Sequence, residues 1–259
     1  MTQQLVFTLA APYGAFAVTF NAANAAVKAT QLDPPKSALV GLLGAALGLE
    51  RLALNELADR LFVAVRTGLR PRPDPKPDYH TITPPAPPRN SGPWTRFEEL
   101  RPALSGLAEP GAILSNRHYW QMGLWTAAVA RHGAEGPTLD ELQGALACPH
   151  WPLYAGRKAC GLGLPPDPVI LEALGPAEAL DAYGWPWTRH PRLRECLADL
   201  PKAVEKASGF DLRYDLGYPG APQTSLEVEV VDEPFHGGSE GRLIRGFRPR
   251  WVGIASTPA

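Results

Sequence analysis

The sequence predicts an α+β fold, and three observations lead to this prediction. Residues 4–10 place Leu5, Phe7 and Leu9 on one side of a strand, and residues 61–67 and 119–129 are further strand candidates. Apolar-periodic segments at residues 38–60 and 138–147 predict helices between the strands. The order strand, helix, strand, arm, strand, helix, strand matches the ferredoxin-like βαββαβ plan, which is also the plan of the RNA-binding RRM.

Local signals mark the helix ends. Ser37 is a candidate N-cap for the first helix, and the glycine at Gly48 indicates a break that divides this helix into two pieces. Thr138, followed by Glu141 three residues later, forms a capping box for the second helix. These signals support two helical segments with defined starts.

Composition limits the class of protein. With 259 residues and 45% hydrophobic content, the chain is large enough for one domain with a real core, or for one domain and a smaller lobe. Its formal net charge is −1, whereas most stand-alone nucleic-acid binders are clearly basic. An RNA-binding role therefore requires a local basic patch, with acidic surface elsewhere.

Cysteine usage and hydropathy predict the cellular context. Cys148, Cys160 and Cys196 lack the close spacing of a zinc site, so we expect no metal and no other cofactor. Such sparse thiols fit a reducing cytoplasm. No apolar run reaches the roughly 18–20 residues that span a bilayer, and no basic residues precede the apolar N-terminal stretch. We therefore expect a cytoplasmic protein with neither a membrane span nor a signal peptide.

The domain organisation follows from a change in composition after residue 66. Residues 71–93 contain nine prolines, and residues 66–101 contain seven Lys or Arg against four acids. This predicts a basic, proline-rich arm at about 66–116 that interrupts an RRM-like domain over residues 1–160. Residues 161–259 are expected to form a small C-terminal lobe, with closing strands at 224–234 and 242–254. Four arginines accompany the last strand: Arg242, Arg245, Arg248 and Arg250.

The best candidate binding site is Gly156-Arg157-Lys158, with Gly161 and Gly163 close behind. Glycines let the backbone turn so that successive N–H groups face an anion, and the two cations add charge-assisted bonds to phosphates. The alternative is an ordinary solvated turn with two surface cations.

Other candidates carry weaker signals. Tyr79 and His80 lie in the basic arm, where they would either stack on a splayed base or anchor the arm on its own domain. Lys36 and Ser37 open the first helix, whose N-terminus suits a phosphate, although Ser37 as a mere cap is equally expected. The electrostatic candidates are Arg66, Arg89, Arg96 and Arg117.

Two further groups favour structural roles. Trp120, Trp125 and Trp151 are expected in the core or at a subunit interface rather than stacked on bases. Asp232 and Glu233 lack companion ligands, so a turn or a salt bridge to another subunit is favoured over a metal site. The C-terminal arginines fit either phosphate binding or packing against another subunit.

Several segments together resemble the Cas-five family of CRISPR-associated proteins, and within it the CasD subunits of subtype E Cascade complexes. They are LAAPYGAF, PPKSALVGLLGAALGLER, AVR followed by DYHTI, RHYWQMGLWTAAV, PLYAGRKAC, VVDEP and RGFRPRWV. The resemblance implies a ferredoxin-like (RAMP) domain with a projecting β-hairpin thumb. It also implies a non-catalytic antiviral subunit that binds the 5′ handle of crRNA between the CasC backbone and the large subunit CasA, and contacts target DNA only indirectly.

Two rival functions stay open at the level of sequence. The subtype C branch of the family cleaves repeat RNA with Tyr, Lys and His, and His118, Tyr119 and Lys158 would supply such a set for metal-independent cleavage. The other rival is a protein-binding scaffold whose proline-rich arm acts as a polyproline ligand, although the arm lacks a repeated PxxP pattern.

Overall fold

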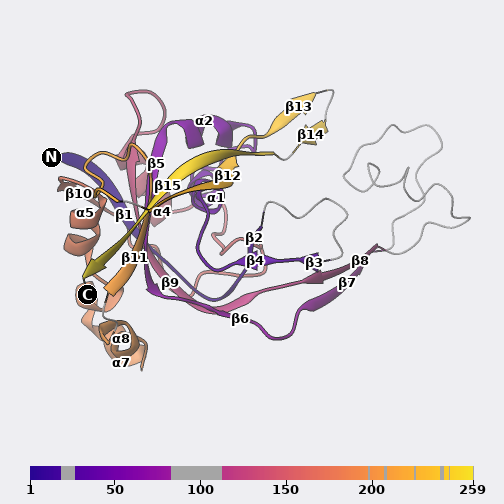
Figure 1. Cartoon of the computed structure of the whole chain (residues 1–259), viewed down its shortest axis with the longest axis horizontal. Helices are drawn as coiled ribbons and strands as arrows, with labels where there is room; N and C mark the ends of the chain where they lie inside the picture. The colour runs from indigo at the N-terminus through magenta and orange to yellow at the C-terminus, as the bar shows by residue number, and fades with distance from the viewer. Residues whose placement is uncertain are drawn as a thin grey trace, which may run out of the picture.

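The computed structural model describes residues 1–18, 27–82, 113–197, 199–206, 209–224, 226–239, 242–244 and 246–258. Its centre is an eight-stranded sheet whose neighbouring strands all run antiparallel. The order is β10 (Val169–Ala173), β1 (Thr2–Gly14), β9 (Trp120–Arg131), β5 (Leu61–Leu69), β11 (Gly209–Asp215), β15 (Phe247–Pro258) and β12 (Leu226–Pro234), with β6 (Arg72–Pro73) paired to β9. The structure is thus mixed α/β with a large antiparallel sheet, shown in Figure 1.

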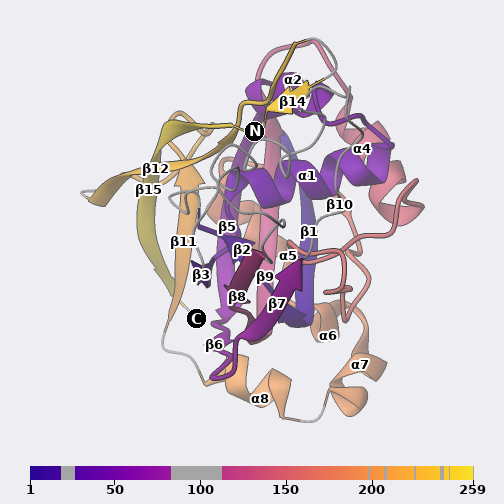
Figure 2. The ribbon, with the colours of Figure 1, turned by 90° about the vertical axis from the view of Figure 1, so that its right-hand side faces the viewer.

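Helices cover both faces of this sheet. Leu5, Phe7 and Leu9 of β1 point to one face, as predicted, and pack in a core with α1 (Lys36–Leu47), α2 (Ala53–Asp59) and α4 (Leu139–Ala147). Figure 2 shows α1 lying across the strands on this side. Val6, on the opposite face, packs with Leu180 and Tyr183 of α5 (Pro176–Tyr183). Three short helices follow: α6 (Pro186–Arg189), α7 (Pro191–Cys196) and α8 (Leu200–Glu205).

The helix ends confirm two predictions and correct one. The first helix does break at Gly48, whose φ of 74° ends α1, and Thr138 does form the capping box with Glu141. Ser37 is not the N-cap, because α1 already begins at Lys36 after Pro35. The N–H of Lys36 instead donates to the Asp232 carboxylate at 2.9 Å. A distant acid thus caps this helix.

A narrow strand pair extends away from the main sheet, on the right of Figure 1. β7 (Asp78–Ile82) pairs antiparallel with β8 (Ile113–Arg117), and β3 (Val27–Lys28) pairs parallel with β8. Two small pairs complete the described strands: β2 (Phe16–Ala17) with β4 (Thr30–Gln31), and β13 (Gly237–Ser239) with β14 (Arg242–Ile244). Most of the proline-rich arm, including Arg89 and Arg96, lies outside the described residues.

The C-terminal third shares the main sheet. β10, β11, β12 and β15 all fall after residue 160, and β11 pairs directly with β5. The lobe predicted for residues 161–259 is therefore joined to the rest of the chain through continuous strand pairing. Among the described residues, no helix has the length and apolar character that a bilayer crossing requires.

Candidate nucleic-acid interface

The Gly156-Arg157-Lys158 loop is held tightly against the end of β1. The Ala155 N–H donates to the Cys160 carbonyl at 2.7 Å, and the Cys160 N–H donates to the Arg157 carbonyl at 2.8 Å. The Ala15 N–H donates to the Ala155 carbonyl at 3.2 Å, which ties the loop to the residue that follows β1. Gly156 has a φ of 81°, and a Cβ there would lie 1.9 Å from the Ala15 carbonyl oxygen. Only glycine fits this position.

The buried side of this loop is apolar. Cys160 is almost fully buried and belongs to the main core, and burial raises the pKa of its thiol although Arg157 acts in the opposite direction. The thiol therefore stays protonated at neutral pH, when it acts as a small apolar anchor. With Cys160 anchored in the core, the other side of the loop presents its cations outward.

Arg157 lies over an aromatic ring. Its guanidinium carbon is 4.4 Å from the ring centre of Tyr119, which is buried and contacts Tyr13 in a tilted arrangement with ring centres 5.3 Å apart. One nitrogen, Nη2, donates to the Lys28 carbonyl at 3.5 Å. Among the described residues, the buried Nη1 has no hydrogen-bond acceptor. A positioned guanidinium with an unused donor suits an anionic ligand.

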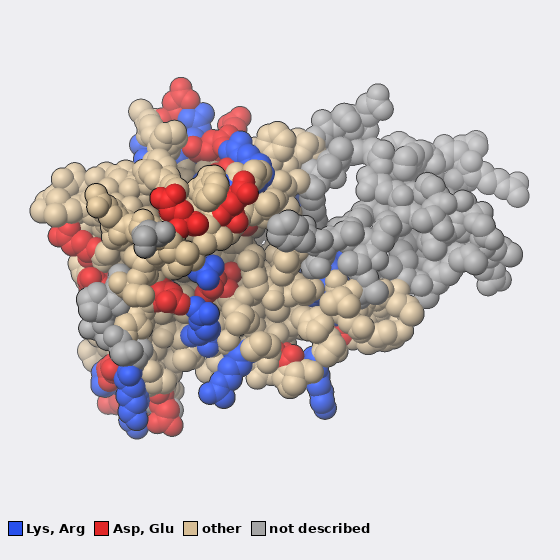
Figure 3. Space-filling view, viewed as in Figure 1, with Lys and Arg blue, Asp and Glu red and all other residues tan. Residues whose placement is uncertain are grey.

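More basic residues gather around Arg157. Lys28 pairs in register with Arg117, and the His118 N–H donates to the Lys28 carbonyl at 3.0 Å. Figure 3 shows Lys and Arg side chains along the lower edge of the view, where β6 and β7 lie. We call the following set the basic surface: Lys28, Arg72, Lys76, Arg117, Arg157 and Lys158. The acids within residues 72–82 are Asp74, in the loop between β6 and β7, and Asp78, at the start of β7.

The structure places the two aromatic candidates on the extended strand pair. Tyr79 is 64% exposed on β7, whereas His80 is half-buried and lies 3.7 Å from the Asp78 carboxylate. Tyr79 is thus free to meet a base. Tyr13 and Lys28 were not predicted from the sequence. Each contributes through a contact that only the fold creates, Tyr13 with Tyr119 and Lys28 with Arg157. The signal that could have found Tyr13 is the LAAPYGAF segment, which contains it.

Two predicted contacts are placed elsewhere. Lys36 is buried, and its ammonium lies 2.7 Å from Glu233 and 3.3 Å from Asp215. With Asp232 already capping the helix, the N-terminus that carries Lys36 and Ser37 meets carboxylates where a phosphate was expected. This geometry does not support Lys36 and Ser37 as phosphate contacts.

Arg66 has a structural environment as well. Its side chain is 4% exposed, donates to the Asp181 carboxylate at 2.7 Å and to the Leu180 carbonyl at 2.8 Å, and stacks on Trp185 at 4.4 Å. Burial lowers the pKa of Arg66 to about 10, and Asp181 offsets part of this effect. The guanidinium joins α5 to β5 and does not support a role in RNA contact.

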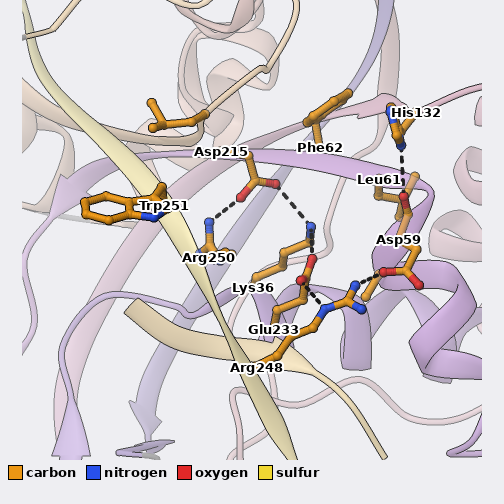
Figure 4. Close-up of a pocket in the computed structure, with 12 residues that line it drawn as sticks. Lys36, Asp59, Leu61, Phe62, His132, Asp215, Glu233, Arg248, Arg250 and Trp251 are labelled. Carbon is orange, nitrogen blue, oxygen red and sulfur yellow. Dashed lines mark hydrogen bonds and ion pairs between the residues drawn. The ribbon is translucent and has the colours of Figure 1, made fainter. Parts of the chain in front are cut away.

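Arg248 and Arg250 form one ion-pair network with Asp59, Asp215, Asp232 and Glu233, and Figure 4 draws all of these except Asp232. Arg250 contacts Asp232 at 2.5 Å and also Asp215, while Arg248 contacts Glu233 at 2.5 Å and also Asp59. Burial acts to lower the pKa of Arg250, but the bonds to Asp232 and Asp215 outweigh it and raise the pKa. The two acids therefore form ion pairs with cations of their own chain. The side chains of Arg242 and Arg245 are not among those that the structure describes.

The tryptophans divide into two groups. Trp120 and Trp125 are fully buried in the main core with ring centres 5.1 Å apart, which confirms their predicted structural role. Trp151 is 54% exposed at the C-terminal end of α1. Of its two predicted roles, core and interface, this exposure excludes the core.

A helix-covered antiparallel sheet with a basic, aromatic-backed surface defines a mixed α/β protein with a candidate nucleic-acid interface. The family model described as CRISPR-associated protein (Cas_Cas5) matches residues 4–224. The chain therefore belongs to this family of CRISPR-associated proteins, and the predicted family membership is confirmed.

Solved structures agree on the fold. A chain of a "CRISPR RNA-guided surveillance complex" is 20% identical, with a TM-score of 0.58, and the match covers 99% of this chain and 90% of that one. A second, described as "Crystal structure of Cas protein", is 20% identical with a TM-score of 0.53, covering 98% of this chain and 95% of that one. No curated protein sequence matches the chain significantly.

Proposed function

We propose that this chain is a non-catalytic subunit of a type I CRISPR Cascade effector complex, in antiviral defence. In this role it binds and caps the 5′ handle of crRNA, and bridges the CasC backbone to the large subunit CasA. The observation that carries the proposal is Arg157, held on the Tyr119 ring beside Lys28 with one buried donor unused among the described residues. The family and the resemblance in fold to a chain of an RNA-guided surveillance complex support an assembly with RNA.

The arrangement of strands supports the finer assignment of the fold. Taken in chain order, β1, β5, β9 and β10 follow the strand–helix–strand–strand–helix–strand plan, and they lie side by side in the order β10-β1-β9-β5. α1 and α4, the two crossing helices, pack on the same face. We assign these elements to a ferredoxin-like domain, and β7 with β8 to the base of a projecting thumb.

The proposed recognition divides between charge and stacking. The basic surface supplies phosphate contacts, which give affinity without reading sequence. Exposed Tyr79 and the partly exposed Tyr13 supply aromatic faces for unpaired bases of the handle, worth about 1–3 kcal/mol per stacked base. Because this surface occupies one region only, a chain of net charge −1 is still able to hold RNA.

The proposal of a non-catalytic role is supported by the environment of Tyr119. Tyr119 is 7% exposed, and its ring contacts both the Arg157 guanidinium and the Tyr13 ring. A tyrosine that serves as a packing platform is poorly placed to exchange protons with a substrate hydroxyl.

The test is to incubate the purified protein with 5′-labelled repeat RNA in EDTA, and to follow binding and cleavage over a salt series. We expect tight, salt-sensitive binding without a product band. Arg157→Ala and Lys158→Ala should each weaken binding about tenfold, and each lost phosphate contact should reduce the slope of log K against log salt by about 0.7. Arg192→Ala, at an exposed arginine of α7, is the matched control.

Two results would contradict the proposal. Unchanged RNA affinity in both loop variants would exclude the basic surface as the RNA site. A discrete product that disappears in His118→Ala would make the chain a metal-independent endoribonuclease acting with His118, Tyr119 and Lys158.

A further inference from the structure

A hollow of about 420 Å³ lies beside the ion-pair network, and Lys36, Arg248 and Arg250 line it. Its walls include Phe62, Leu216 and Trp251, and Asp59 and His132 lie at its rim, as Figure 4 shows for the labelled residues. This volume falls in the range of small-ligand pockets and is large enough to receive one long side chain.

The floor of the hollow offers no unopposed positive charge among the described residues. Each of its cations contacts two carboxylates: Lys36 contacts Glu233 and Asp215, Arg250 contacts Asp215 and Asp232, and Arg248 contacts Glu233 and Asp59. Among the residues that line the hollow, these three cations face three carboxylates, Asp59, Asp215 and Glu233, so the hollow has no net positive charge. A phosphate entering it would therefore meet no net attraction.

The surface beside the hollow is acidic and aromatic. Trp251 of β15 is 53% exposed, although its neighbour Val252 is buried. Its partner across the strands is Glu229 of β12, which is exposed, as is Glu227 two residues earlier on the same face. Figure 3 shows acidic side chains gathered over β12 and β15. β12 is also the last strand of the sheet, so its outer edge is unpaired within the described residues.

We infer that this face docks a basic, extended segment of a partner protein, with one arginine side chain entering the hollow and stacking on Trp251. A guanidinium is flat enough to cover the indole, and its several N–H groups match the carboxylate of Glu229, which lies across from Trp251. An extended backbone suits the free edge of β12. The negative charge of the face selects a basic protein and rejects RNA. This inference goes beyond the proposed RNA role, and neither depends on the other.

The test uses the full chain and a short peptide of alternating threonine and arginine, with a threonine–glutamate peptide as its counterpart. Affinity is measured by the fluorescence anisotropy of the labelled peptide, and the site of binding is followed through the indole N–H resonances of the tryptophans. The arginine peptide should shift the Trp251 signal saturably, and the glutamate peptide should not. Glu229→Lys and Trp251→Ala should each weaken binding of the arginine peptide at least tenfold. Trp251→Ala also assigns the signal, and Glu229→Lys leaves it in place.

Matched controls come from the same chain. Trp151→Ala removes an equally exposed tryptophan, 54% against 53%, and Glu195→Lys reverses an exposed acid on α7. Both should keep peptide affinity within twofold. Equal binding of the two peptides, no shift at Trp251, or an equal loss in Trp151→Ala would each overturn the inference. A chain that binds the peptide but no repeat RNA contradicts only the RNA role, and the reverse result overturns only the docking inference.

Discussion

Two arginines illustrate how far a single residue can be interpreted from sequence. Arg66 and Arg157 were both predicted to contact RNA, and both lie beside aromatic rings. Arg66 is paired with Asp181 inside the protein, whereas Arg157 keeps a buried donor without an acceptor among the described residues. Asp181 is 115 residues from Arg66 and Lys28 is 129 residues from Arg157, so sequence pattern alone gave both arginines the same interpretation.

A prediction at this scale concerns Asp167, which has a φ of 49° and accepts hydrogen bonds from Arg189 at 2.9 Å and His190 at 2.7 Å. Burial acts to raise the pKa of Asp167, but these bonds outweigh it and lower the pKa. A folded pKa below the unfolded one stabilises the protein above the unfolded value, and this stabilisation is lost as pH falls through the folded pKa. Asp167→Asn should therefore cost about 1–3 kcal/mol at pH 7 and progressively less in acid.

Urea unfolding of both proteins at pH 7, 5 and 3 measures this difference. Asparagine also tolerates a positive φ, so the substitution isolates the charge. Asp199→Asn, at an 89% exposed carboxylate paired with Lys202, is the control and should change stability by less than about 0.5 kcal/mol. A difference that stays constant with pH would rule out the ion pairs as the source.

At the scale of elements, local signals succeeded where the determinant was local. The capping box of α4 and the break after α1 depend on residues within a few positions, and both were confirmed. The prediction of Ser37 as the N-cap of α1 was wrong, because the cap comes from Asp232, about two hundred residues away in β12. The glycine loop combines both cases, since its turn is local but its fit against β1 is not.

Gly156→Ala tests that fit. The added Cβ would meet the Ala15 carbonyl and the φ of 81° would be strained, so the loop should move away from β1 and carry Arg157 off the Tyr119 ring. We expect repeat-RNA affinity to fall at least fivefold and stability to fall by about 1–3 kcal/mol. RNA titrations and urea unfolding measure the two effects. Gly161→Ala adds a Cβ into open space and should leave both unchanged; similar losses in both variants would show that the Gly156 contact is not the determinant.

For the whole molecule, the ion-pair network joins the first third of the chain to its last strands. Lys36 of α1 bridges Asp215 of β11 and Glu233 of β12. The basic surface is the opposite kind of feature, because it gathers cations such as exposed Lys76 and Lys158 on one side of the molecule. The two sets separate structural from binding charges in a chain whose net charge is only −1.

Lys36→Met and Lys158→Met should therefore have crossed effects. Lys36→Met removes the cation that Asp215 and Glu233 share, although Arg250 and Arg248 still contact them, and should cost about 1–3 kcal/mol with RNA affinity within twofold. Lys158→Met removes an exposed cation and should weaken RNA binding with stability almost unchanged. Thermal unfolding and RNA titration of both variants decide the matter. Loss of RNA affinity in a well-folded Lys36→Met protein would restore the phosphate role predicted from the sequence.

The sequence by itself determined the strands at residues 4–10, 61–67 and 119–129, the break at Gly48, the capping box of Thr138 and the family, because periodicity, caps and motifs are written in neighbouring residues. Only the tertiary structure decided which cations are available. Lys36, Arg66, Arg248 and Arg250 meet acids from distant segments, whereas Arg157 meets Tyr119 and keeps an unused donor among the described residues. The charge of a side chain is local, but its neutralisation depends on partners that only folding brings within reach.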